Sequence, residues 1–116
     1  MSETSLSERG WKDATLEYLS RLPEEDWPTQ RELVERLSIS ELFYRQQLRL
    51  EGASFKALKA QIRLNRAVHL LRSGCYRSTG EVAEDLGFCD EPSFRRAFKR
   101  WAGCSPAVYL IRRATR

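Results

Sequence analysis

The sequence predicts an all-α protein of about seven helices, in which two similar helix–turn–helix units are joined by one long helix. Proline and glycine fall mostly between segments whose apolar residues repeat at helical spacing. No alternating Val, Ile and Thr pattern typical of strands occurs. Two Ser/Thr-x-x-Glu capping boxes also mark helix starts. The 116 residues, 41% of them hydrophobic, fit one domain with a modest core.

The N-terminal part predicts two helices. The first covers about residues 8–22 and ends at Pro23. The second begins at Thr29, because Thr29 and Glu32 form a capping box. The inner faces of these helices are expected to carry Trp11, Thr15, Tyr18, Leu19, Leu22, Leu33, Val34 and Leu37.

A third helix is expected from Ser40, its N-terminal cap, to about Glu51. Gly52 ends it, since glycine readily adopts the conformation that closes a helix. Tyr44 and Leu48 stand four residues apart and therefore face the core together. The second and third helices form the first helix–turn–helix unit.

A long fourth helix is expected over about residues 54–73, closed by Gly74. At 1.5 Å per residue it spans roughly 30 Å. Its apolar stripe consists of Phe55, Leu58, Ile62, Val68 and Leu71.

The C-terminal part repeats the pattern of the first unit. Ser78 opens the second capping box and a fifth helix, which Gly87 ends. A sixth helix covers about residues 90–102, and a seventh about residues 106–113, with proline in its first turn. Apolar positions that correspond between the units are Leu33 and Val82, Leu37 and Leu86, Tyr44 and Phe94, and Leu48 and Phe98.

Charge is distributed unevenly along the chain. The formal net charge is +4. Residues 1–40 hold five basic against nine acidic residues, a net −4, whereas residues 41–116 hold fifteen against seven, a net +8. A basic region of this size suits a polyanionic partner, because neutralised phosphates release counterions.

The sixth helix combines an apolar face with a basic one. The apolar positions, spaced i, i+3, i+4 and i+7, are Phe94, Ala97, Phe98 and Trp101. The remaining positions include Ser93, Arg95, Arg96, Lys99 and Arg100. Such a helix, after a helix and a turn, can enter the major groove of DNA, where Arg binds guanine while later cations suit phosphates. The alternative is an ordinary amphipathic surface helix.

The third helix is expected to expose Leu42, Arg45, Gln46 and Arg49. Gln can form two bonds with adenine, and an exposed leucine can contact a thymine methyl group. Alternatively, Leu42 or Phe43 packs against a neighbouring helix. Both alternatives stay open for this helix.

The sequence predicts no catalytic site, metal site or cofactor. His69 is the only histidine, and no glycine-rich phosphate loop is present. Cys75, Cys89 and Cys104 stand far apart, so we expect buried structural thiols, with a redox role left open. No segment can span a bilayer, and no secretion signal occurs at the N-terminus. A cytoplasmic protein is expected.

Two groups of residues carry a family resemblance. In the second unit they are Glu81-Val82-Ala83, Leu86-Gly87-Phe88, Phe94, Arg96-Ala97-Phe98-Lys99-Arg100-Trp101, Gly103, Ser105-Pro106 and Tyr109. In the first unit and the long helix they are Ser40, Tyr44, Leu48, Glu51-Gly52, Ser54-Phe55, Arg63, Ala67 and Leu70-Leu71. Over about residues 10–111 the chain resembles the AraC/XylS family of bacterial transcription regulators, in its C-terminal DNA-binding domain.

The resemblance implies sequence-specific binding to double-stranded DNA, in the bacterial nucleoid, and contact with RNA polymerase. It divides the domain into a first helix-turn-helix subdomain (about 8–53), a linker helix (about 54–73) and a second subdomain (about 74–116). A linker of roughly 30 Å can hold two recognition helices about one DNA turn, ~34 Å, apart. A monomer would then bind an asymmetric site that spans two major grooves.

The resemblance also implies residue roles. The base-reading candidates are Leu42, Arg45, Gln46, Pro92, Ser93, Arg95 and Arg96. The phosphate-binding candidates are Ser40, Arg49, Ser78, Lys99 and Arg100, the serines through backbone N–H groups at helix starts. Gln46, Thr79 and Leu110 depart from the residues common in the family.

Two further expectations concern the chain as a whole. Most family members carry an effector-binding domain before this one, so we expect an excised C-terminal domain rather than a stand-alone regulator. The alternative function is a helical protein-interaction module whose basic face binds an acidic partner.

Overall fold

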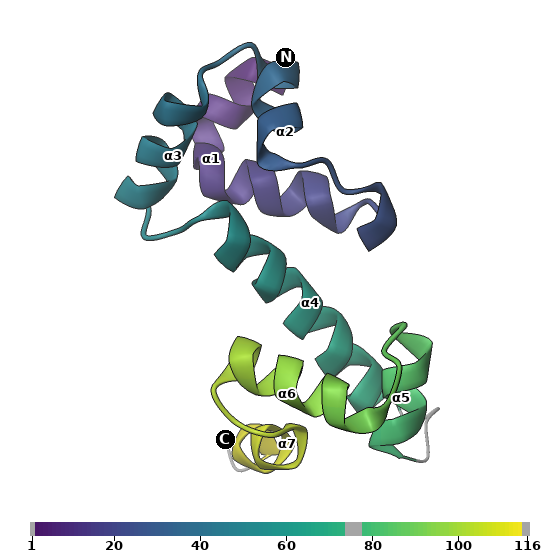
Figure 1. Cartoon of the computed structure of the whole chain (residues 1–116). Helices are drawn as coiled ribbons and strands as arrows, with labels where there is room; N and C mark the ends of the chain where they lie inside the picture. Colours follow the sequence, from purple (N-terminus) through teal and green to yellow (C-terminus); the bar gives the residue numbers. More distant parts are fainter. Residues whose placement is uncertain (1, 74–77, 115–116) are drawn as a thin grey trace. The chain divides into compact units, whose positions relative to one another are not determined.

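The structure is a computed structural model that describes residues 2–73 and 78–114. These residues form α-helices, one short 3-10 helix and no strand, so the all-α prediction is confirmed (Figure 1). In chain order the elements are α1 (Ser2–Ser20), η1 (Glu24–Asp26), α2 (Gln30–Leu37), α3 (Glu41–Leu50), α4 (Phe55–Arg72), α5 (Thr79–Asp85), α6 (Glu91–Ala102) and α7 (Pro106–Ala114). No helix among the described residues is long and apolar enough to cross a membrane.

The chain divides into two compact units, residues 1–62 and residues 63–116. Each unit has its own hydrophobic core. The first contains α1, α2 and α3, and the second contains α5, α6 and α7. Helix α4 begins in the first unit and ends in the second.

The core of the first unit is built by one face from each of four helices. Its buried residues are Leu19, Leu33, Val34, Tyr44, Leu48, Phe55, Leu58 and Ile62. The Trp27 indole N–H donates to the carbonyl oxygens of Leu19 and Leu22, at 2.9 and 3.2 Å, and so satisfies the C-terminal end of α1. Tyr18 was expected on the inner face but is 37% exposed. Its hydroxyl accepts a hydrogen bond from Arg36 at 2.6 Å, which keeps the ring at the surface.

Aromatic side chains dominate the core of the second unit. The buried residues are Ala67, Val82, Ala83, Phe94 and Phe98. The Phe98 ring meets Phe94 and Tyr109 edge-on, with centroids 5.9 and 5.6 Å apart. Phe88, in the turn before α6, packs on Phe94 at 5.4 Å. These contacts hold α6 by its inner face.

Local caps start the helices where the sequence predicts. Thr29 and Glu32 form both bonds of the capping box of α2. Ser40, Ser78 and Asp90 each accept a backbone N–H three residues later. The helix ends predicted at Gly52 and Gly87 have positive φ angles of 70° and 90°. Gly103, for which no such role was predicted, ends α6 with a φ of 83°. Gly74, expected to close α4, lies outside the described residues.

The start of α1 differs from the prediction. The helix begins at Ser2 and is interrupted at Gly10, whose φ of 83° and ψ of 160° are not helical. The segment Trp11–Ser20 therefore begins a helical run of its own.

Candidate nucleic-acid interface

Helix α6 is held by its inner face and presents a basic outer face. Phe94, Ala97 and Phe98 are buried, as predicted. Side chains exposed from the same helix are Pro92, Arg95, Arg96, Lys99 and Arg100, whereas Ser93 is half-buried. Because α5 and a short turn precede it, α6 is the second helix of a helix–turn–helix unit, the position of a recognition helix.

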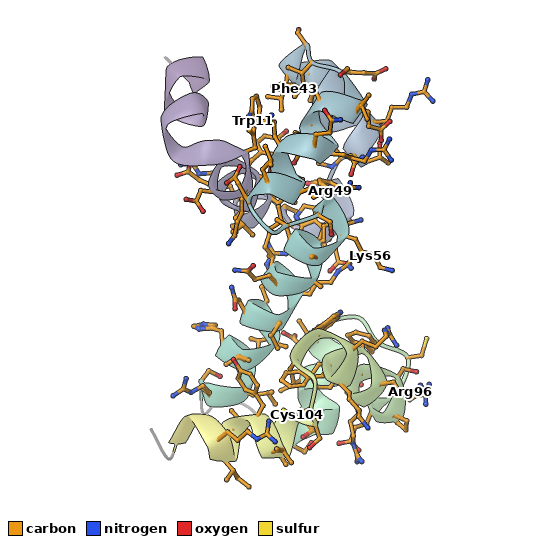
Figure 2. All side chains as sticks on the ribbon, turned by 90° about the vertical axis from the view of Figure 1, so that its left-hand side faces the viewer. Trp11, Phe43, Arg49, Lys56, Arg96 and Cys104 are labelled. Carbon is orange, nitrogen blue, oxygen red and sulfur yellow. The ribbon has the colours of Figure 1, made fainter. Side chains whose placement is uncertain are left out.

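The two arginines in the middle of α6 are held toward its first turns. Arg95 forms an ion pair with Glu91, one turn earlier. Arg96 Nη2 donates to the Ser93 hydroxyl at 3.3 Å. Arg96 projects from the second unit (Figure 2). Both arginines are exposed in the N-terminal half of α6, and the N-terminal part of the recognition helix is what contacts base edges in such units.

Asp90 supplies the N-terminal cap of α6. Its Oδ1 accepts the Ser93 N–H at 2.8 Å. Hydrogen bonds from the Ser93 side chain and backbone lower the pKa of Asp90 below its ordinary value of 3.8. The helix start therefore carries its own anion, which favours the helix through the macrodipole.

Helix α3 has the same construction in the first unit. Tyr44 and Leu48 are fully buried, and burial raises the pKa of Tyr44. Arg45, Gln46 and Arg49 are exposed. The buried inner face thus fixes α3, while its cationic and amide groups face outward. In α6 the inner face is likewise buried and the outer face is likewise polar.

At the start of α3, one apolar residue is exposed and the next one packs against a neighbouring helix. Leu42 is 59% exposed, so its methyl groups are accessible to a partner. Phe43 is 41% exposed and meets the Trp11 ring edge-on, with centroids 5.9 Å apart (Figure 2). Phe43 therefore packs against α1, and Leu42 does not take that place.

The two serine candidates act as helix caps. Ser40 Oγ accepts the Phe43 N–H at 3.0 Å, and Ser78 Oγ accepts the Glu81 N–H at 3.3 Å. Each hydroxyl is therefore used within its own helix. A phosphate contact at these positions depends on the remaining first-turn N–H groups.

Sequence reasoning assigned no role to Glu51. Its carboxylate accepts the backbone N–H of Trp11, 40 residues earlier, at 3.0 Å. Nothing local marks this bond, because neither residue belongs to the other's helix. The one signal in the sequence is the glycine at position 10, since glycine tolerates the positive φ that interrupts α1 there.

Cysteine burial was predicted incorrectly. Cys89 is exposed, because it lies in the turn before α6 and its neighbour Phe88 makes the core contact instead. Cys104 is half-buried. Cys75 lies outside the described residues. Within the described part of the chain, no group of three or more His, Cys, Asp or Glu residues is placed to hold a metal ion.

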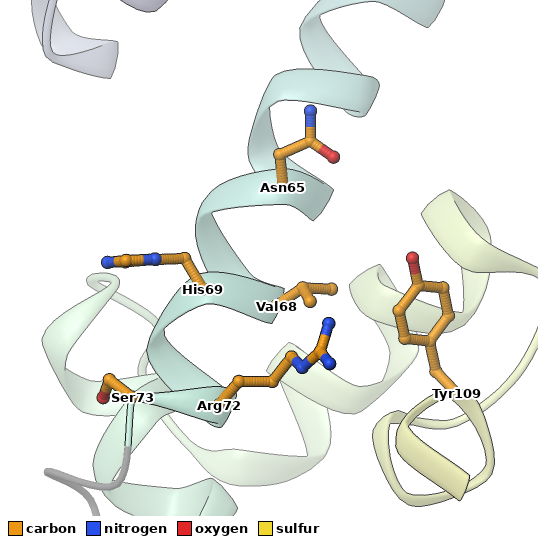
Figure 3. Close-up of a pocket in the computed structure, with 6 residues that line it drawn as sticks. All are labelled: Asn65, Val68, His69, Arg72, Ser73 and Tyr109. Atoms are coloured by element: carbon orange, nitrogen blue, oxygen red, sulfur yellow. The ribbon is translucent and has the colours of Figure 1, made fainter. Parts of the chain in front are cut away.

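A hollow of about 410 Å³ lies in the second unit, beside the C-terminal half of α4 (Figure 3). It is lined by Asn65, Val68, His69, Arg72, Ser73 and Tyr109. Figure 3 shows Val68 and Arg72 turned toward Tyr109, whereas His69 projects to the other side of α4. The described lining offers a guanidinium and no carboxylate, so it forms no acid–base pair. Its polar, mostly exposed side chains differ from the enclosed apolar lining typical of small-molecule sites.

The fold agrees with comparisons to known proteins. A family profile for a helix-turn-helix domain of the AraC type matches residues 33–112. The chain belongs to the AraC/XylS family of transcription regulators. Members of this family are DNA-binding transcriptional regulators, and the family is not enzymatic.

Two relatives match most of this chain with a part of their own length. An uncharacterized HTH-type transcriptional regulator of Mycobacterium tuberculosis is 35% identical over 86 residues, which cover 74% of this chain and 25% of the relative. The HTH-type transcriptional regulator VqsM of Pseudomonas aeruginosa is 28% identical over 92 residues, 79% of this chain and 28% of the relative. The chain thus spans about a quarter of the length of the curated relatives it matches.

Solved structures give the same result. The transcriptional regulator CdpR of Pseudomonas aeruginosa has a TM-score of 0.65 and 33% identity, over 86% of this chain and 31% of its own. The C-terminal domain of AraT, a response regulator of Geobacillus stearothermophilus, has a TM-score of 0.62 and 29% identity, over 90% of this chain and 84% of its own.

Proposed function

We propose that this AraC-type chain regulates bacterial transcription by binding an asymmetric site on double-stranded DNA, with α3 and α6 in successive major grooves. One observation carries the proposal: each unit fixes the second helix of its helix–turn–helix by fully buried residues and exposes Arg or Gln on the opposite face. Direct reading of base edges needs this combination, because a helix must be rigid to present side chains in register.

The roles proposed for residues within the two helices are those that the resemblance to the AraC/XylS family implies. The base-reading group is Leu42, Arg45 and Gln46 on α3, with Pro92, Ser93, Arg95 and Arg96 on α6. Arg bonds guanine O6 and N7, Gln bonds adenine, and the exposed Leu42 meets a thymine methyl. The phosphate-binding group is Ser40, Arg49, Ser78, Lys99 and Arg100. Phosphate contacts fix the register of the protein and carry no sequence information directly.

The proposal of two grooves rests on the presence of two such helices and on α4. Helix α4 has 18 residues, a length of about 27 Å at 1.5 Å per residue. Successive major grooves on one face of DNA are ~34 Å apart. Two different recognition helices make the bound site asymmetric, so a monomer suffices. Contact with RNA polymerase is part of the proposal as what the family resemblance implies.

Selection from a random duplex library at physiological salt tests the proposed function. We expect enrichment of one motif with two dissimilar halves about one DNA turn apart. Enrichment of a single short motif would contradict the two-groove part. Binding without any sequence preference would contradict base reading and favour the protein-interaction module with an acidic partner.

A further inference from the structure

Helix α1 contains a helix start that lacks its own cap. The chain leaves helical geometry at Gly10, so the first N–H groups of Trp11–Ser20 have no partner within the helix. Glycine at this position has no side-chain oxygen, unlike the Ser, Thr, Asp or Asn that usually accept these bonds. The acceptor is therefore either water or a group from elsewhere in the unit.

Glu51 supplies the missing acceptor. Its Oε2 accepts the backbone N–H of Trp11 at 3.0 Å. Both of its carboxylate oxygens accept the backbone N–H of Lys12 at 3.4 Å. Negative charge at a helix N-terminus is also favoured by the macrodipole. Glu51 directly follows the last residue of α3, as its C-terminal cap. The bond therefore ties the start of the Trp11–Ser20 segment to the end of α3.

Gly10 leaves room for this bond in two ways. Its φ of 83° is a backbone conformation that is strained for residues other than glycine. In addition, a Cβ atom at Gly10 would lie 2.7 Å from Glu51 Oε1. The carboxylate thus occupies the space that a side chain at residue 10 would take.

Contacts from the same part of α1 reach the inner side of α3. The Trp11 ring meets Phe43 and Tyr44 edge-on, with centroids 5.9 and 6.3 Å apart. Thr15 and Tyr44 join their hydroxyl groups in a buried hydrogen bond. Tyr44 directly precedes Arg45 in the chain, so these contacts bear on the residues proposed to read bases.

We infer that Glu51 is a positioning residue for the recognition helix α3, which it fixes against α1 by capping the Trp11–Ser20 segment. The inference rests on the proposed reading of DNA by α3. Recognition side chains must be held within about 0.5 Å of their productive geometry. Buried Tyr44 and Leu48 hold α3 by its inner face, and Glu51 adds a tether at its C-terminal end.

The test measures discrimination at the first half of the selected site. Discrimination is the ratio of affinities for the selected duplex and for the same duplex with the α3 half scrambled. Glu51→Ala should lower this ratio at least about fivefold, the size of a single base-pair mismatch. Glu51→Gln should fall between Glu51→Ala and the parent chain, because its amide oxygen still accepts one N–H. Discrimination at the α6 half should not change.

The control separates positioning from loss of stability. Thr29→Ala removes a helix cap in the same unit, on α2, and leaves the α1–α3 tether intact. Measured well below every unfolding midpoint, Thr29→Ala should keep the parent discrimination. Parent-like discrimination in Glu51→Ala, or an equal loss in Thr29→Ala, overturns the positioning role.

Gln46→Ala distinguishes this failure from failure of the proposed function. If Gln46→Ala lowers discrimination at the α3 half and Glu51→Ala does not, base reading stands and positioning is overturned. If neither variant lowers it, the base-reading role of Gln46 and the positioning role of Glu51 are both overturned.

Coupling between Gly10 and Glu51 gives an independent check. Gly10→Ala places its Cβ against the carboxylate and should lower the same ratio. In the Glu51→Ala background the same change should lower the ratio less than it does in the parent chain, because the bond is already lost and only the backbone strain at residue 10 remains. Full additivity of the two losses overturns the assignment of a shared contact.

Discussion

At the scale of single residues, neighbouring cations on α6 are expected to have different roles. Arg96→Ala should cost about 1–3 kcal/mol on the selected site and relax specificity at one base pair. Lys99→Ala should weaken binding to all duplexes about equally and lower the salt slope by about one. Fluorescence anisotropy over a series of salt concentrations measures both. The two residues are matched controls, since both are exposed on the same helix. A uniform loss from Arg96→Ala would contradict its base-reading role.

Asp90 predicts a pH-dependent contribution to stability. Because the pKa of Asp90 is lowered in the folded chain, its carboxylate contributes stability above its ordinary pKa of 3.8. That contribution is lost as the pH falls below this value through the lowered pKa. Asp90→Asn keeps an acceptor that does not titrate. The stability advantage of the parent chain over Asp90→Asn should therefore shrink as the pH falls below 3.8, measured by thermal unfolding. An advantage that stays constant with pH would exclude the charged cap.

Single residues also mark the limit of sequence reasoning about the interface. Helical spacing predicted that Tyr44 and Leu48 are buried, and they are. It did not decide between Leu42 and Phe43, because their surroundings depend on Trp11 in a different helix. The exposure of Cys89 was missed for the same kind of reason, since Phe88 takes the core position beside it.

At the scale of helices, local chemistry determined what could be predicted. Capping residues act over three or four positions, so the starts of α2, α3 and α6 follow from Thr29, Ser40 and Asp90 alone. At the interruption of α1 at Gly10, the acceptor for the Trp11 N–H is Glu51, which is distant in sequence. Helix boundaries set by tertiary contacts are therefore the ones that sequence patterns did not reveal.

The contact between α1 and α3 predicts a coupled pair of buried hydroxyls. Thr15 donates its proton to the Trp11 carbonyl at 2.8 Å, so Tyr44 must donate to Thr15. Tyr44→Phe should cost about 0.5–1.5 kcal/mol of unfolding free energy. Thr15→Val should cost about 1–3 kcal/mol, because it leaves the Tyr44 hydroxyl buried without its acceptor.

A double-mutant cycle in chemical denaturation tests this pair. The double variant should be less destabilised than the sum of the two single variants, since the apolar pair leaves no unsatisfied hydroxyl. Strict additivity would mean that the two hydroxyls do not depend on each other.

At the scale of the whole molecule, the two units repeat one helix arrangement but expose different side chains on the two helices proposed to read DNA. The repeat was visible in the sequence because Tyr44 and Leu48 correspond to Phe94 and Phe98, and all four are fully buried. The exposed faces differ, because α3 exposes Leu42 and Gln46 beside its arginines, whereas α6 exposes the neighbouring arginines Arg95 and Arg96. A shared scaffold with different outer faces is what an asymmetric DNA site requires.

The spacing of the two half-sites tests whether one continuous helix links the two surfaces. Inserting five base pairs between the halves rotates one half by about half a turn, since B-DNA has ~10–10.5 base pairs per turn. Affinity should then fall to that of a duplex with one intact half. Inserting ten base pairs restores the rotation but adds ~34 Å to the distance between the two halves. An α4 of 18 residues is too short to bridge that larger distance, so affinity should stay low.

Titration of the three duplexes at one salt concentration measures the effect, and the half-scrambled duplexes set the baseline. Undiminished affinity with five inserted base pairs would show that one unit alone reads the site, or that the connection between the units is not rigid.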